Sequence, residues 1–158
     1  MAVFCQYCHY PAELQTGAKI YPEHPHLAAK QIWVCKPCKA RVGCFEGTDT
    51  PLGELANGKL RAARSKAHMA FDPIWQLMHS KKGGDRHEVR RKTRDWLAAQ
   101  LQLPADEFRL GGLTYDQCLQ AVLVCRALLD QLSSNYGMPA PAIREPGEDD
   151  LLKEDVAF

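Results

Sequence analysis

Four cysteines near the start of the chain have the types and spacing of a metal site. They form two Cys-x-x-Cys pairs, Cys5 with Cys8 and Cys35 with Cys38, with 26 residues between the pairs. A Cys-x-x-Cys turn places two sulfur atoms on one side of a tight loop, so two such turns can complete a tetrahedron. Zn²⁺ favours four thiolates at about 2.3 Å in structural sites. The spacing therefore predicts one structural Zn²⁺ bound by all four cysteines, with no water ligand.

Two disulfides are the alternative interpretation of these four residues. Disulfides need an oxidising compartment, and the seven cysteines of this chain are an odd number. We expect Cys44 to be a small buried hydrophobe, and Cys118 and Cys125 to be thiols on the buried face of a helix. Three histidines in the same region as the cysteine pairs do not have better spacing. Zinc is therefore the favoured interpretation.

The segments around the cysteines predict a small β-structure, which we assign to residues 1–50 as a zinc-ribbon module. Residues 18–21 and 31–34 contain strand-forming types and are expected to form a β-hairpin between the two cysteine turns. A helix opening at Cys38 would give a treble clef instead, but residues 39–44 look extended and favour the ribbon. A module of this size has almost no core of its own, so it needs the metal to fold.

Length and composition indicate a globular protein. A chain of 158 residues, 46% hydrophobic and 25% charged, can hold a small metal module and a helical domain. We therefore expect an α+β fold, mainly α, in which the zinc ribbon packs on a helical domain. No apolar run has the length of a membrane span, and the N-terminus lacks the features of a signal peptide. These features predict a protein of the reducing cytoplasm with no membrane partner.

The helical domain is expected over residues 51–136. Asn57 is a suitable N-cap for a helix over 58–71, in which apolar residues recur with helical spacing. The pair Asp72-Pro73 is expected to end this helix and to start a short second one, because proline suits the first position of a helix. The sequence thus predicts two helices where the chain passes Pro73.

Two further helices are expected before an acidic tail. Asp85 is expected to cap a helix over 86–101, and Thr114 begins a capping box for a helix that runs to about residue 133. Residues 137–158 combine prolines with acids and are expected to be a disordered tail. The last helix has a predicted buried stripe that consists of Cys118, Val122, Cys125 and Leu129.

Charge is distributed unevenly along a chain whose net charge is only +1. Residues 59–94 contain eleven Lys and Arg against three acids, whereas residues 101–158 contain four against ten. Such a split is typical of a basic binding face with an acidic tail, although two solvated helix faces that compensate each other are the alternative. A basic face can neutralise phosphates. The candidate nucleic-acid-binding residues are Arg61, Arg64, Lys66, Arg86, Arg90, Arg91 and Arg94.

Several motifs together resemble a known family. Cys-x-x-Cys is followed by Gly-x-x-Ile-Tyr-Pro at 17–22 and by Trp-x-Cys-x-x-Cys at 33–38, and shorter motifs continue to the segment Phe-Asp-Pro-x-Trp at 71–75. This pattern resembles a zinc-finger-containing domain family found in bacteriophages and prophages. The resemblance covers residues 5–75 well and continues weakly beyond them. It implies phage origin and zinc, and it implies no reaction.

These observations predict a non-enzymatic phage or prophage protein that binds nucleic acid or a nucleic-acid-handling complex. No glycine-rich phosphate loop or nucleophile elbow is present, and no small-molecule substrate is evident. A protein–protein inhibitor of a host defence complex, of the anti-CRISPR type, is the alternative, because an acidic segment can imitate phosphates. A lesser alternative is a metal-dependent nuclease that uses His68 and Asp72, which lie four residues apart.

Overall fold

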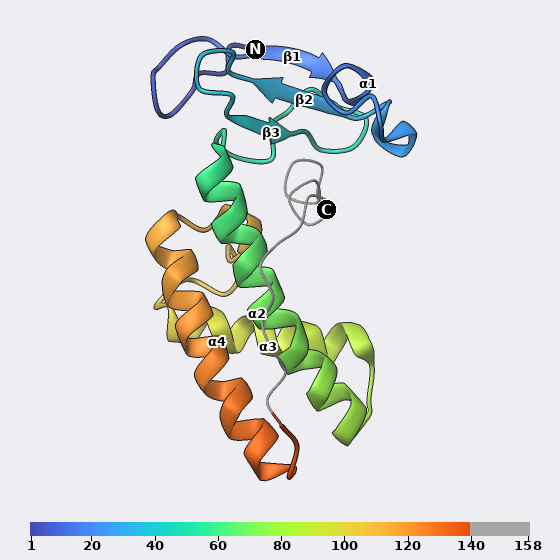
Figure 1. Cartoon of the computed structure of the whole chain (residues 1–158), viewed down its shortest axis with the longest axis vertical. Helices are drawn as coiled ribbons and strands as arrows, with labels where there is room; N and C mark the ends of the chain where they lie inside the picture. Colours follow the sequence, from blue (N-terminus) through green and yellow to red (C-terminus); the bar gives the residue numbers. More distant parts are fainter. Residues whose placement is uncertain (140–158) are drawn as a thin grey trace. The chain divides into compact units, whose positions relative to one another are not determined.

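A computed structural model describes residues 1–139 of the chain (Figure 1). These residues form two compact units, Met1–Ala62 and residues 63–139, which we call the N-terminal unit and the helical unit. From residue 140 onward, the predicted acidic tail lies outside the described residues. The predicted α+β fold, mainly α, is confirmed, because a small antiparallel sheet precedes a series of helices.

The N-terminal unit contains a three-stranded antiparallel sheet. Its strands are β1 (Glu13–Thr16), β2 (Gln31–Val34) and β3 (Arg41–Gly43), in the order β1-β2-β3. The predicted strand at 31–34 is therefore confirmed, and it is the central strand. The predicted extended path after Cys38 is also confirmed, since β3 pairs with β2 from Val34↔Arg41 to Ile32↔Gly43. The first cysteine pair therefore precedes β1, and the second pair lies in the turn that joins β2 to β3.

The predicted strand over residues 18–21 is wrong. The strand that pairs with β2 lies earlier in the chain and ends at Thr16, opposite Gln31, so β2 offers no further partner to the residues that follow. Those residues instead form the short helix α1 (Gly17–Ile20), and a 3₁₀ turn, η1 (Pro25–Leu27), follows it. Gly17 permits this turn, because a Cβ atom at that position would overlap the carbonyl group of Leu27.

The predicted helix break at Asp72-Pro73 is also wrong. Helix α2 (Gly58–Lys82) is continuous and contains Pro73 (Figure 1). A proline inside a helix costs about 3 kcal/mol, but complete burial of Phe71 and Ile74 on either side contributes about 1.5–3 kcal/mol each. Asp72 does not cap a new helix, since its carboxylate accepts a hydrogen bond from the indole N–H of Trp75 at 2.9 Å.

The remaining helix boundaries agree closely with the sequence. Asn57 caps α2 through a 2.9 Å hydrogen bond from the backbone N–H of Leu60, and Asp85 caps α3 (Arg86–Gln100). A 3₁₀ turn, η2 (Leu110–Gly112), leads to α4 (Tyr115–Asn135), whose capping box at Thr114 is present as predicted. Among the described residues, no helix is both long enough and apolar enough to cross a membrane.

One continuous apolar core holds the helical unit together. Its fully buried side chains come from α2, α3, α4 and the η2 segment. Two of the predicted core thiols belong to it, and burial raises the pKa of the Cys125 thiol to about 12. Burial of this many apolar side chains stabilises the unit without any metal. The largest fully buried side chains among them are Phe71, Ile74, Leu97, Leu113 and Leu129.

Candidate metal centre

Each cysteine pair lies in a turn of the same construction, and we call the two turns the first knuckle (residues 3–12) and the second knuckle (residues 33–42). In both, the backbone N–H of the first cysteine donates to the carbonyl oxygen five residues later, Cys5 to Tyr10 at 2.9 Å and Cys35 to Ala40 at 2.8 Å. The residue after the second cysteine has a left-handed backbone in both knuckles, with φ 59° at His9 and 56° at Lys39. The two metal-binding turns are therefore structural repeats.

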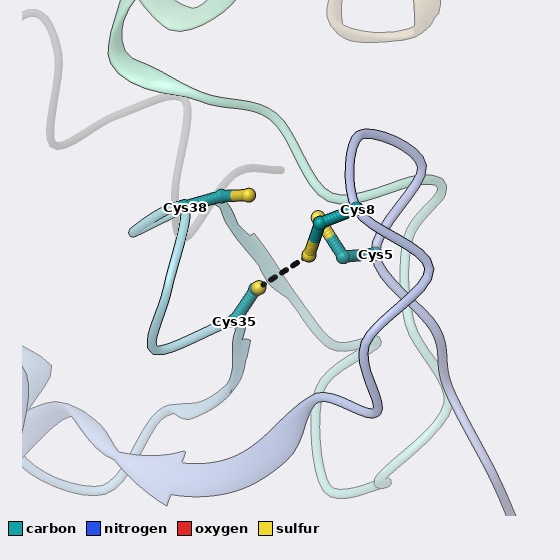
Figure 2. A group of neighbouring side chains, drawn as sticks. All are labelled: Cys5, Cys8, Cys35 and Cys38. Carbon is teal, nitrogen blue, oxygen red and sulfur yellow. Dashed lines mark hydrogen bonds between the residues drawn. The ribbon is translucent and has the colours of Figure 1, made fainter.

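The knuckles bring the four sulfur atoms together (Figure 2). All four Sγ atoms lie within 4.8 Å of one another, and the Sγ atoms of Cys8 and Cys35 are 3.5 Å apart. A tetrahedron with Zn–S bonds of about 2.3 Å has sulfur–sulfur distances of about 3.8 Å, so the cluster has the size that Zn²⁺ requires. Cys5 and Cys35 are buried, whereas Cys8 is exposed and Cys38 is half-buried.

The four thiols differ in their electrostatic surroundings. Burial raises the pKa of the Cys35 thiol, and a hydrogen bond with Cys8 together with burial raises the pKa of Cys38 to about 12. A hydrogen bond with the backbone of Tyr10 lowers the pKa of Cys8. Zinc binds thiolates, so metal binding must displace protons from Cys35 and Cys38 at neutral pH. The site therefore favours a metal whose affinity for sulfur can drive this deprotonation.

The other candidate ligands lie elsewhere. Among residues 1–139, these four cysteines form the only group of three or more ligand-type side chains that could hold one ion. Cys44 forms an isolated β-bridge with Pro51 and packs against the small apolar cluster that includes Cys5 and Cys35. Burial raises the pKa of its thiol. His24 and His26 lie between α1 and β2, and their rings contact each other edge to face with ring centres 5.7 Å apart.

The first knuckle also contacts the segment that leads into α2, which the sequence did not indicate. The side-chain amide of Gln6 donates to the carbonyl oxygen of Leu55 at 2.6 Å, and the Tyr7 hydroxyl accepts from the backbone N–H of Asn57 at 3.1 Å. Both contacts join residues about fifty positions apart, and no local pattern predicts such pairs. The two residues between the cysteines therefore hold the N-cap of α2 next to the metal-binding turn.

Comparison with known families agrees with this geometry. A family described as a zinc-finger-containing domain matches residues 1–128. The chain belongs to this family. The match extends well beyond residues 5–75, where the motifs were clearest, and includes α2, α3 and much of α4. No curated protein and no solved structure is significantly similar to the chain. Family membership and the cysteine cluster together support one structural Zn²⁺, because four thiolates leave no open position for a substrate.

The three candidate nucleic-acid-binding residues of α2 are partly buried. Burial, and secondarily the nearby charge of Arg41, lowers the pKa of Arg61 to about 10, so this residue stays charged at neutral pH. The guanidinium group of Arg64 donates to the carbonyl oxygen of Leu113 at 2.9 Å. Lys66 is half-buried on the same helix. Arg64 therefore has a structural role in the helical unit.

The four candidates of α3 are more accessible. Arg86 is exposed, with its guanidinium carbon 5.1 Å from the ring centre of Trp75, and Arg90 is half-buried at 5.8 Å from that of Phe71. Arg91 is exposed and lies 3.9 Å from acidic oxygens one turn away in each direction. Arg94 is half-buried. The exposed positive charge is therefore concentrated toward the start of α3.

The structure brings His68 and Asp72 onto one continuous helix but does not join them to a metal cluster. Asp72 is engaged by the indole N–H of Trp75, and neither residue belongs to a group of three potential ligands within residues 1–139. One histidine and one carboxylate fall short of a defined nuclease site.

Proposed function

We propose that this zinc-binding protein binds nucleic acid, or a complex that handles nucleic acid, through a basic surface at the α2–α3 corner of the helical unit. The observation that carries the proposal is the charge of residues 81–94, which contain seven Lys and Arg against two acids before Asp95. In this proposal the zinc site stabilises the N-terminal unit and takes no part in a reaction. The phage origin and host-cell location that the sequence resemblance implies belong to the same proposal.

The α2–α3 corner holds its cations in place without neutralising them. Lys81 lies 5.5 Å from the ring centre of Tyr136, and Arg86 lies 5.1 Å from that of Trp75. A cation over an aromatic face is ordered by the ring but keeps its full charge. Lys82 adjoins them and is exposed, and the turn between the helices is Gly83-Gly84. Ordered, exposed cations beside a small turn suit contact with phosphate groups.

Arg91 and Lys92 are also available for phosphate, although each has an acidic neighbour. Both lie near Glu88, at 3.9 Å and 3.5 Å, and all of these side chains are at least half exposed. Exposed ion pairs of this kind contribute only about 0–1 kcal/mol, so a phosphate can displace them. The nearby acids lower the net charge but do not remove the basic surface.

The test is salt-dependent binding of labelled DNA and RNA to the zinc-loaded chain, measured by fluorescence anisotropy. We expect binding at low salt that weakens steadily as salt is added. The double substitution Arg86→Glu/Arg91→Glu should weaken binding at least tenfold and reduce the salt slope by about one for each phosphate that the protein no longer binds. Both side chains are exposed, so the fold should be retained.

The matched control is Lys19→Glu, which reverses an exposed charge in the N-terminal unit. It should leave binding nearly unchanged. Absence of binding to either nucleic acid at low salt would exclude direct binding. Binding that is equally strong in Arg86→Glu/Arg91→Glu would place the interface elsewhere. A host protein that remains bound after nuclease treatment would favour the alternative of a protein–protein inhibitor.

A further inference from the structure

Helix α4 exposes two large apolar side chains on the side that does not face the core. Leu119 is 46% exposed and Leu123 is 63% exposed, whereas Cys118, Cys125 and Leu129 on the other side are buried. The two leucines are one turn apart, so they form a continuous apolar strip. Apolar side chains grouped on a helix face are typical of contact surfaces, and the fold of the helical unit does not need them for its own core.

Two opposite charges lie at the ends of this strip. Asp116 precedes Leu119 by three residues, and Arg126 follows Leu123 by three residues. Spacings of three, four and three keep all four residues on one face of a helix, as in the seam of a coiled coil. Both charged residues are exposed, and neither takes part in an ion pair among residues 1–139. The face therefore has the order acid, Leu, Leu, base.

This order is complementary to itself when one helix is reversed. We propose that two copies of the chain associate through antiparallel α4 helices, with Leu119 of each copy against Leu123 of its partner. In that register Asp116 of each copy lies opposite Arg126 of its partner. The contact is isologous, so each interaction occurs twice about a two-fold axis. Two apolar contacts and two ion pairs then cover the exposed strip.

Other pairings of the same faces are less favourable. Parallel helices would place each charge opposite the same charge of the partner. An antiparallel register centred on Leu123 would place Asp116 opposite Asp130, and both are acidic. Like charges in direct opposition disfavour both of these arrangements relative to the register that pairs Leu119 with Leu123.

The proposed dimer is weak. Stable interfaces bury about 1,200–2,000 Å² in total, and a strip of four residues on one helix buries less than this. Its ion pairs lie near solvent, so added salt weakens the charged contribution. We therefore expect a monomer–dimer equilibrium at high micromolar concentration, which a single measurement on dilute protein would miss.

The first experiment is sedimentation equilibrium of nuclease-treated, zinc-loaded protein over a wide concentration range. The average mass should rise from 17.7 kDa toward twice that value. Leu123→Glu should abolish this rise without loss of secondary structure, because the side chain is mostly exposed. The matched control is Gln120→Glu, which adds the same charge at an exposed position beside the strip. A mass that stays at the monomer value up to millimolar concentration overturns the proposal.

The second experiment tests the register by exchange of charges. Arg126→Asp should weaken dimerisation about tenfold, because it places two acids opposite each other on both sides of the axis. The double variant Asp116→Arg/Arg126→Asp should restore it, since the exchanged charges again oppose each other. Asp130→Arg should have little effect, because the position opposite it lies before the start of α4. If Arg126→Asp and Asp116→Arg/Arg126→Asp both dimerise as strongly as the unsubstituted chain, the antiparallel pairing is wrong.

Discussion

The two compact units of the chain bury cores of different size and chemistry. The helical unit has one apolar cluster of fourteen buried residues. The N-terminal unit has two small clusters, and the larger of them counts Cys5 and Cys35 among its six buried residues. Two metal ligands are therefore also core residues. Because so little apolar surface is buried elsewhere in this unit, its stability should depend on zinc, whereas that of the helical unit should not.

The largest effect on this difference is expected when one zinc ligand is removed. Cys35→Ser should abolish tight zinc binding and unfold much of the N-terminal unit, since structural zinc contributes about 10–16 kcal/mol in small modules. The helical unit should keep its far-UV circular dichroism, because its core contains none of the ligands. Zinc content, measured by elemental analysis, and limited proteolysis of residues 1–62 are the readouts.

The matched control for this substitution is Cys44→Ser. Cys44 packs beside the same core but lies outside the four-sulfur cluster, so zinc content should stay at one ion per chain. If Cys35→Ser has the same zinc content and the same protease resistance as the unsubstituted chain, the assignment of this cysteine as a ligand is wrong. Loss of zinc in Cys44→Ser would show instead that packing around the cluster, and not ligation alone, decides metal retention.

Acidification should lower the stability of the N-terminal unit through loss of zinc, and no mutation is needed to show this difference from the helical unit. In the metal-free state the pKa of Cys35 is raised by burial and that of Cys38 is raised to about 12, so both hold protons at neutral pH. Zinc binding removes these protons, and therefore zinc affinity and the stability that it supplies are present at neutral pH and fall as the pH falls. Each displaced proton adds about a tenfold loss of apparent affinity per pH unit. Competition with a chelating dye between pH 8 and about pH 6 measures this loss.

A core substitution should produce the opposite pattern. Phe71→Ala removes a fully buried ring from the helical unit and should lower its free energy of unfolding by about 3–5 kcal/mol. Zinc affinity should stay unchanged, because no ligand contacts this core. Denaturant unfolding followed by circular dichroism gives the first quantity. Gln76→Ala, at an exposed position on the same helix, is the control and should change stability little. A simultaneous loss of zinc would show that the two units are coupled in stability.

The sequence predicted best those elements that depend on local residues. The caps at Asn57, Asp85 and Thr114 are present, because each needs only a polar side chain and the backbone within the next turn. The cysteine cluster was also predictable, since its spacing encodes the two turns directly. Helix caps and Cys-x-x-Cys turns thus carry their structural information within a few residues.

The two errors in the fold have a common cause. Pro73 has a strong local preference to begin a helix, but burial of Phe71 and Ile74 on both sides keeps α2 continuous. Residues 18–21 have strand-forming types, but β2 is already paired with residues 13–16. In both cases tertiary packing overrides a local preference, and a single sequence does not reveal which distant residues supply it.

The smallest expected effect concerns the contact between the first knuckle and the start of α2. Tyr7→Phe removes the hydroxyl that accepts from the backbone N–H of Asn57, and removal of this hydrogen bond should cost about 0.5–1.5 kcal/mol. Water can replace part of it, because Tyr7 is 41% exposed, so zinc affinity should weaken by no more than about tenfold. Tyr10→Phe is the matched control, because this ring is 59% exposed and its hydroxyl makes no hydrogen bond among the described residues. Competition titration with a zinc chelator compares the two variants. If Tyr7→Phe and Tyr10→Phe bind zinc with the same affinity, the knuckle is stabilised by its metal alone, and the contact with Asn57 contributes nothing to the difference between the units.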